Sequence, residues 1–144
     1  SKFSLGVSGI KQETAAAIEA HASDPSSPLY PGEGYARLIA YPAGADRDEA
    51  LFNRLTNEKD HYYSYLYTAL FIKEVLAQWQ RAGYDISDRP EIVATIFNLG
   101  FAGSVPKPAP QAGGSTVTVG GVNYSFGGLA EAFYRSGQLP ALLQ

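Results

Sequence analysis

The sequence predicts a mainly helical domain with one small β-hairpin near its C-terminal end. Segments with apolar residues at helical spacing follow residues typical of helix N-caps, and Gly120-Gly121 separates two alternating stretches, STVTV and VNYSF. A further segment, His61 to Gly83, is apolar on nearly every side over its first four turns. A helix without a polar face has to be surrounded by protein, so we expect this one to be the central helix.

The first half of the chain contains two predicted helices and a loop. Thr14 is the predicted N-cap of a short helix that ends near Ala22, because its hydroxyl can accept a hydrogen bond from a free backbone amide. Prolines and glycines between Ser23 and Gly34 predict a surface loop. Asp46, with Glu49 three residues later, forms a capping-box pattern that predicts the start of the second helix.

The second half adds a helix, a loop and the hairpin. Asp88 and Pro90 predict a helix start, and Gly100 predicts its end. Residues 104–128 form a predicted Pro/Gly-rich loop followed by the hairpin, and a short helix with an apolar tail is predicted after them. With 45% hydrophobic residues, the 144-residue chain is the size of a single domain, residues 1–144, with one core.

Composition argues against several classes of partner. The net charge is −3 and the basic residues are scattered singly, so we expect no nucleic-acid partner. The chain has no cysteine, and no apolar run approaches the roughly 20 residues that a membrane-spanning helix needs.

The ionisable residues indicate neither a nucleophile triad nor a metal site. The two histidines, His21 and His61, show no metal-ligand spacing, and no carboxylate cluster resembles a calcium loop, so we expect no metal and no cofactor. Several glutamates fit helix surfaces or first turns: Glu19, Glu49, Glu58, Glu74 and Glu91. Glu13 lies at the predicted loop-to-helix junction, where it either favours the helix N-terminus or serves as a catalytic acid.

A cluster of tyrosines at the start of the central helix suits either a half-buried core or a carbohydrate-binding groove. Its members are Tyr62, Tyr63, Tyr65 and Tyr67. We expect core packing for at least two of the four. Asn98 is polar among apolar residues near a predicted helix end, so it either satisfies backbone carbonyls or presents its amide to a cleft.

Two separated stretches resemble one family, the soluble lytic transglycosylases and goose-type lysozymes. The stretch SLGVSGIKQETA, Ser4 to Ala15, resembles the family segment S-x-x-G-A-x-G-L-M-Q-I-M-P-x-T-A. The stretch ATIFNLG, Ala94 to Gly100, resembles the family segment A-A-Y-N-A-G, with Phe97 in place of the tyrosine and Asn98 retained. The order of the two stretches, and the helical body between them, also match the family. The resemblance implies a lysozyme-like α+β fold.

The first stretch aligns with the family in two ways. With a gap of three residues before Thr14, Gln12 takes the place of the family glutamine. Without a gap Gly9 takes that place, and this version is favoured because it keeps the helix start in position.

The resemblance implies cleavage of the β-1,4 bond between N-acetylmuramic acid and N-acetylglucosamine in peptidoglycan. The reaction needs a glutamic acid whose pKa is raised so that it remains protonated. In the family this glutamate precedes a serine, so Ser1-Lys2-Phe3 matches the end of that motif and the acid is expected just before Ser1. A lysozyme-like core without the helix that carries the acid would expose apolar surface, so an N-terminal companion segment is expected as a partner.

The resemblance also implies a glycan cleft, an extracytoplasmic location and a peptidoglycan strand as partner. The expected substrate-binding residues are Ser8, Gly9, Gln12, Tyr62, Tyr63, Phe97 and Asn98, and Glu13 is the fallback acid. Two alternatives stay open: a non-catalytic glycan-binding or structural module that kept the fold, and a helical interaction domain whose aromatic residues all belong to the core.

Overall fold

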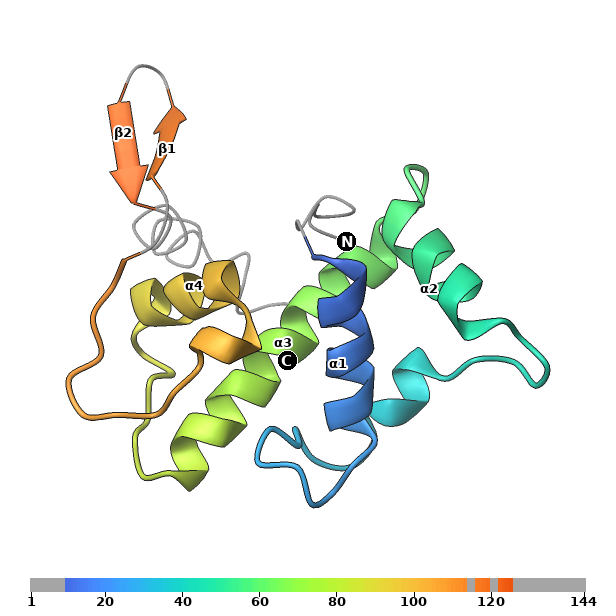
Figure 1. Ribbon diagram of the computed structural model, residues 1–144, viewed down its shortest axis with the longest axis horizontal. Helices are drawn as coiled ribbons and strands as arrows, with labels where there is room; N and C mark the ends of the chain where they lie inside the picture. Colours follow the sequence, from blue (N-terminus) through green and yellow to red (C-terminus); the bar gives the residue numbers. More distant parts are fainter. Residues whose placement is uncertain (1–9, 114–115, 120–121, 126–144) are drawn as a thin grey trace. The chain divides into compact units, whose positions relative to one another are not determined.

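The computed structural model describes residues 10–113, 116–119 and 122–125 and is mainly helical in these ranges (Figure 1). The chain divides into two compact units, Ser1–Glu74 and Val75–Gln144, and each is described by itself. The prediction of a single domain over residues 1–144 stays a prediction.

The first unit consists of α1 (Gln12–Ala22), the 3-10 helix η1 (Ala36–Ile39), α2 (Arg47–Thr56) and the beginning of α3 (Tyr62–Arg81). Helix α1, blue in Figure 1, packs against both η1 and α2. The core is formed by apolar residues at helical spacing, among them Ile18, Leu51, Leu55, Leu70 and Phe71. The predicted loop from Ser23 to Gly34 contains no helix or strand.

The two predicted N-caps in this unit have different outcomes. Asp46 caps α2 as predicted, because its carboxylate accepts a hydrogen bond from the Glu49 amide at 3.2 Å. The prediction for Thr14 is wrong, because α1 begins two residues earlier, at Gln12. Lys11 is the N-cap, with extended backbone angles (φ −75°, ψ 150°), and its carbonyl accepts from the Ala15 amide at 3.0 Å. Gln12 and Glu13 are good helix formers, so the helix extends through them.

The second unit contains the end of α3, then α4 (Pro90–Leu99) and the 3-10 helix η2 (Phe101–Gly103). Pro90 occupies the first turn of α4, where its missing amide costs no hydrogen bond. The predicted end at Gly100 is confirmed: this residue has φ 82°, a backbone conformation that favours glycine.

Strands β1 (Thr116–Val119) and β2 (Val122–Ser125) pair antiparallel, with Val119 opposite Val122. The two glycines predicted to form the turn lie outside the described residues, so the two-residue turn stays a prediction. The helix and apolar tail predicted after the hairpin, residues 127–143, also lie outside them.

The segment from Ser104 to Gly113 has no regular secondary structure, as its prolines and glycines predict, and both of its ends are anchored. The Trp79 indole Nε1 donates to Ser104 Oγ at 3.0 Å, and Ser104 Oγ donates to Gln78 Oε1 at 2.6 Å. At the other end, the Gly113 amide donates to Thr95 Oγ1 at 3.0 Å. These bonds tie the segment to α3 and α4.

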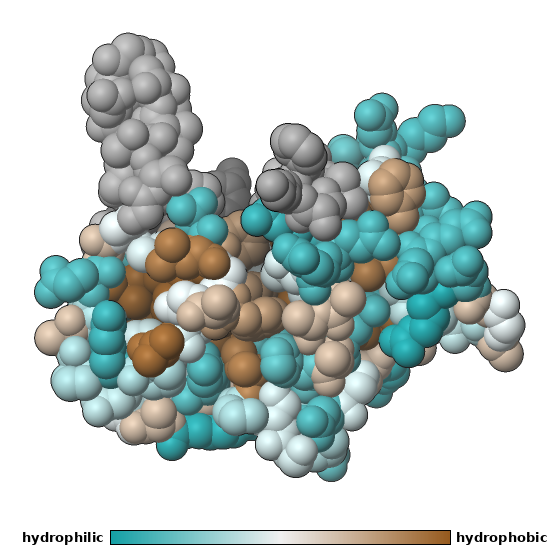
Figure 2. Space-filling model, viewed as in Figure 1, coloured by the Kyte–Doolittle hydropathy of each residue, from teal (hydrophilic) through white to brown (hydrophobic). Residues whose placement is uncertain are grey.

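Apolar surface remains open in this unit. Leu99 is 55% exposed and Val105 is 60% exposed. In the face shown in Figure 2, brown apolar atoms gather over the region of α4 and η2. The exposed part of the segment after η2 therefore includes an apolar side chain, that of Val105.

We expect Ser104→Ala to lower the free energy of unfolding by about 1–3 kcal/mol, the usual cost of a buried donor left without an acceptor. Both partners are buried, Trp79 with 2% and Ser104 with 4% of its surface exposed, so water does not replace the hydroxyl. Urea denaturation followed by tryptophan fluorescence measures the change. Ser87→Ala, at an exposed position, is the control. Equal stabilities of the two variants would contradict the anchoring role.

Candidate functional site

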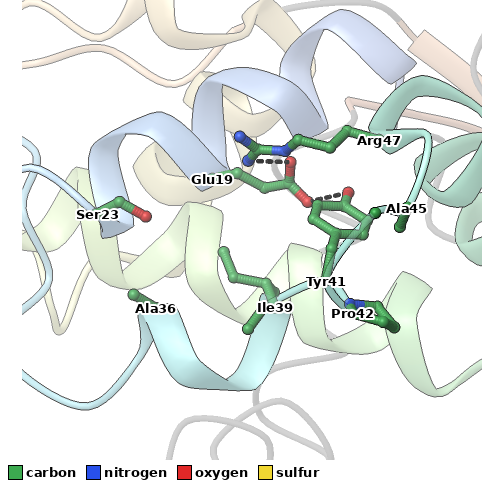
Figure 3. A pocket seen from close by; sticks show the side chains of 10 residues that line it. Glu19, Ser23, Ala36, Ile39, Tyr41, Pro42, Ala45 and Arg47 are labelled. Atoms are coloured by element: carbon green, nitrogen blue, oxygen red, sulfur yellow. Dashed lines mark hydrogen bonds and ion pairs between the residues drawn. The ribbon is translucent and has the colours of Figure 1, made fainter.

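A pocket of about 420 Å³ opens in the first unit between α1, η1, the loop that follows η1, and the start of α2. Glu19 lies at its floor and Arg47 at its rim (Figure 3). Glu19 belongs to the buried stripe of α1, together with Ala15, Ile18 and Ala22. Its position on the helix therefore directs its carboxylate toward the interior.

One oxygen of Glu19 is fully engaged. Oε2 accepts hydrogen bonds from the hydroxyls of Tyr41 and Tyr67, both at 2.5 Å. It also forms an ion pair with Arg54 Nη1 at 3.5 Å. The side chain of Glu19 is 8% exposed and that of Arg54 is 10% exposed, so this pair lies largely away from water. Buried charges need such partners, because an unpaired one is costly.

Arg54 joins four parts of the unit. Its Nη1 donates to the Ile39 carbonyl at 2.8 Å and to the Tyr67 hydroxyl at 3.0 Å, and its Nη2 donates to the Ala40 carbonyl at 2.7 Å. Its guanidinium carbon also lies 3.9 Å from the ring centre of Tyr41 and 4.4 Å from that of Tyr63. A planar guanidinium has the donors and the flat faces for all these contacts at once.

The tyrosine hydroxyls act as donors in this network. Burial, followed by the hydrogen bond to Glu19, raises the pKa of Tyr41 to about 12. The same two causes raise the pKa of Tyr67 further. Both hydroxyls therefore keep their protons at neutral pH and donate them to the Glu19 carboxylate.

A second pocket, of about 460 Å³, lies on α1 and α2 and shares Glu19, Ser23 and Arg47 with the first. Asp48 and Leu51 contribute to its lining from α2. The two pockets therefore meet at the side chains of Glu19 and Arg47.

The structure places two residues of the predicted cleft at the start of α1. Gln12 donates from Nε2 to the Asp48 carbonyl at 3.1 Å, so its amide holds α1 to α2. Glu13 is exposed in the first turn of α1. This position suits a carboxylate that favours the helix N-terminus, and it lacks the apolar setting of a catalytic acid. A catalytic role for Glu13 stays a prediction that its position does not favour.

Tyr62 and Tyr63 lie in the first turn of α3, in the same unit. Tyr62 is 51% exposed, and its ring meets that of Tyr63 edge-on at 5.2 Å. Tyr63 is half-buried beside Arg54, as described above. Tyr65 is 48% exposed and Tyr67 is fully buried. The tyrosine cluster is therefore divided between the surface and the core.

The remaining predicted site residues lie in the second unit or outside the described residues. Phe97 is half-buried and Asn98 exposed on the last turn of α4, in the second unit. Ser8 and Gly9 lie outside the described residues.

Two of the glutamates expected on helix surfaces are buried, and for them that expectation is wrong. Glu19 is 6% exposed and Glu74 is 0% exposed. Among the residues that the structure describes, neither oxygen of Glu74 has a hydrogen-bond partner. Burial raises the pKa of Glu74 to about 9, so its carboxyl group is neutral at physiological pH.

Helical spacing could have revealed both buried glutamates. Glu19 follows Ala15 by four residues, and Glu74 follows Leu70 by four and Phe71 by three, so each shares a face with apolar residues. The sequence around Tyr41 and Arg54 does not predict their part in the site, because their hydrogen-bond partners come from other elements.

Comparisons of the chain with protein-family models, with curated proteins and with solved structures gave no match. Within residues 10–113, 116–119 and 122–125, no three His, Asp or Glu side chains form a group suited to a metal ion. In the same ranges no helix combines the length and apolar character that crossing a membrane requires.

Arg54→Met should lower the free energy of unfolding by about 3–5 kcal/mol, because it removes the buried cation beside Glu19 Oε2 and leaves only the exposed Arg47 near the other oxygen. The double variant Glu19→Met with Arg54→Met should recover part of this loss, since it removes both charges. Urea denaturation of the wild type, both single variants and the double variant gives the coupling energy. A loss below about 1 kcal/mol, as for an exposed pair, would show that the network does not hold the unit together.

Glu74 should make stability fall as the pH rises. In the folded chain its carboxyl group remains protonated up to about pH 9, whereas in the unfolded chain it ionises above its ordinary pKa of 4.5. Between these values the unfolded state binds fewer protons, so each added pH unit costs up to about 1.4 kcal/mol of stability.

The measurement is urea denaturation at several values between about pH 5 and about pH 8, where this linkage acts. Glu74→Gln should flatten the dependence because the amide does not ionise, and the exposed Glu13→Gln should leave it unchanged. Parallel curves for the wild type and Glu74→Gln would show that Glu74 is ionised in the folded chain.

Proposed function

We propose that the chain belongs to a peptidoglycan-cleaving protein, a muramidase or lytic transglycosylase that acts on the bond between N-acetylmuramic acid and N-acetylglucosamine. The observation that carries the proposal is the order of elements around the two resembling stretches. The first stretch leads into α1, the 20-residue helix α3 follows, and the second stretch ends α4 at Gly100. This order agrees with the one that the resemblance implies, and the proposal includes a lysozyme-like α+β fold.

The exposed tyrosines support a role in binding sugar. Tyr62 presents about half of its surface to solvent, and its contact with Tyr63 limits the orientations of its ring. A fixed aromatic ring with a free face is suited to the apolar face of a pyranose, and its hydroxyl can bond to sugar hydroxyls. Phe97 and Asn98 are the proposed contacts of the second stretch.

We consider three described glutamates as general acids. A general acid has to keep its proton and reach the substrate, and each of the three fails one of these two requirements. Glu13 is exposed, Glu19 is ion-paired with Arg54, and Glu74 is neutral but closed off from solvent. The proposal therefore keeps the acid at the position before Ser1, on an N-terminal companion segment. Action on peptidoglycan also implies an extracytoplasmic location, which is part of the proposal.

The alternative is a non-catalytic module that binds glycan strands or serves a structural role with the same fold. The favouring observation is that none of the three glutamates weighed above has both a retained proton and access to a substrate, while exposed aromatic side chains remain. Binding without cleavage would identify this alternative.

Binding is tested by co-sedimentation of the chain with purified peptidoglycan sacculi. Tyr62→Ala should weaken binding about fivefold, equivalent to about 1 kcal/mol for a lost aromatic contact. Leu38→Ala, which removes an exposed apolar side chain on η1, is the matched control and should bind like the wild type. If the wild type does not bind sacculi, both the proposed cleavage of peptidoglycan and the alternative role in glycan binding are contradicted.

Cleavage is tested on the full-length protein, against a variant with glutamine at the proposed glutamate before Ser1. Mass spectrometry of released muropeptides should show products only without the substitution. Anhydro ends would identify a lytic transglycosylase and reducing ends a muramidase. Equal product from both proteins would show that the acid lies elsewhere.

A further inference from the structure

The second oxygen of Glu19 is an acceptor that the protein leaves open. While Oε2 accepts from two tyrosines, the nearest cation to Oε1 is Arg47 Nη2 at 3.9 Å, which is too long for a hydrogen bond. Among the described residues none donates a hydrogen bond to Oε1. Glu19 and Arg47 each line both pockets. A largely buried carboxylate therefore presents an unused oxygen to solvent-filled space.

Arg47 supplies the opposite charge at the same place. Its side chain is 71% exposed, and its guanidinium carbon lies 5.2 Å from the ring centre of Tyr41, which also lines the pocket. The N-terminus of α2 adds no attraction for an anion, because Asp46 caps it and Asp48 and Glu49 lie in its first turn. An incoming carboxylate would therefore be held by the guanidinium of Arg47.

The two charges define the ligand. A ligand that is only a cation would displace Arg47 from Glu19 and leave the arginine without a carboxylate partner. A ligand that is only an anion would be repelled by the carboxylate of Glu19. A small zwitterion satisfies both sides: its ammonium donates to Oε1 and its carboxylate accepts from Arg47. In an α-amino acid the two groups sit on one carbon, which matches side chains 3.9 Å apart.

The size and the lining of the pocket further limit which zwitterions can bind. A volume of about 420 Å³ is at the small end for ligand sites. Beyond the charged pair, the lining combines three alanines with the larger apolar side chains of Ile39, Pro42 and Tyr41. This lining favours a short aliphatic side chain.

We propose that the pocket between α1, η1 and α2 binds a free α-amino acid with a small aliphatic side chain, held by Glu19 Oε1 and Arg47. The ligand replaces one long ion pair with two charge-assisted hydrogen bonds, while the engaged oxygen keeps its tyrosine donors. This site is independent of the proposed action on glycan strands.

Isothermal titration calorimetry of the full 144-residue chain with alanine and valine tests the proposal. Two analogues remove one charge each: N-acetylalanine lacks the ammonium and alanine amide lacks the carboxylate. We expect saturable binding of the amino acids and at least tenfold weaker binding of both analogues. These comparisons leave the protein unchanged, so they do not depend on how a variant folds.

Arg47→Ala should weaken the binding of alanine at least tenfold, whereas alanine amide, whose ammonium no longer has to displace Arg47 from Glu19, should bind this variant at least as tightly as the wild type. Arg37→Ala, which removes an exposed arginine that does not line the pocket, is the control and should bind normally. The proposal is overturned if no amino acid saturates the protein below about 10 mM. It is also overturned if N-acetylalanine binds as tightly as alanine, or if Arg47→Ala binds alanine like the wild type.

Discussion

The first unit depends on the buried pairing of Glu19 with Arg54. Either side chain alone would place an uncompensated charge in a region of low dielectric, at a cost of several kcal/mol. Together, and with Tyr67, they connect α1, η1, α2 and α3 through hydrogen bonds that have few alternative geometries. The contact that neutralises the charge therefore also sets the relative positions of the four elements.

Glu74 shows what the same residue type does without such partners. It lies on a helix among apolar side chains, as Glu19 does, but no described group donates to it. The only way to lower the cost of burial is to bind a proton, which explains the pKa of about 9. One buried carboxyl group is thus an ion-paired acceptor beside a pocket, and the other is a neutral acid inside the unit.

Local signals in the sequence predicted the elements well, while the site depends on contacts that such signals do not carry. Asp46 and Gly100 mark helix ends because a cap acts over a few residues, and the same reasoning failed at Thr14 because Lys11 meets the geometric requirement as well. The donors to Glu19 are 22, 35 and 48 residues away in sequence. No periodicity relates such positions, so the charged floor of the pocket follows from the tertiary structure alone.

The distribution of carboxyl groups also bears on how this chain could act on glycans. Acid catalysis needs one group that is protonated and within reach of the substrate. Here Glu74 is protonated but enclosed, Glu19 lines a pocket but is paired with arginine, and Glu13 is exposed in the first turn of a helix. Glu19 would become protonated only if Arg54 were removed, and Arg54 holds the unit together. Stability and acid catalysis therefore conflict at this position. None of these three carboxyl groups combines a retained proton with access to a substrate, and for that reason the proposed function assigns the acid to another residue.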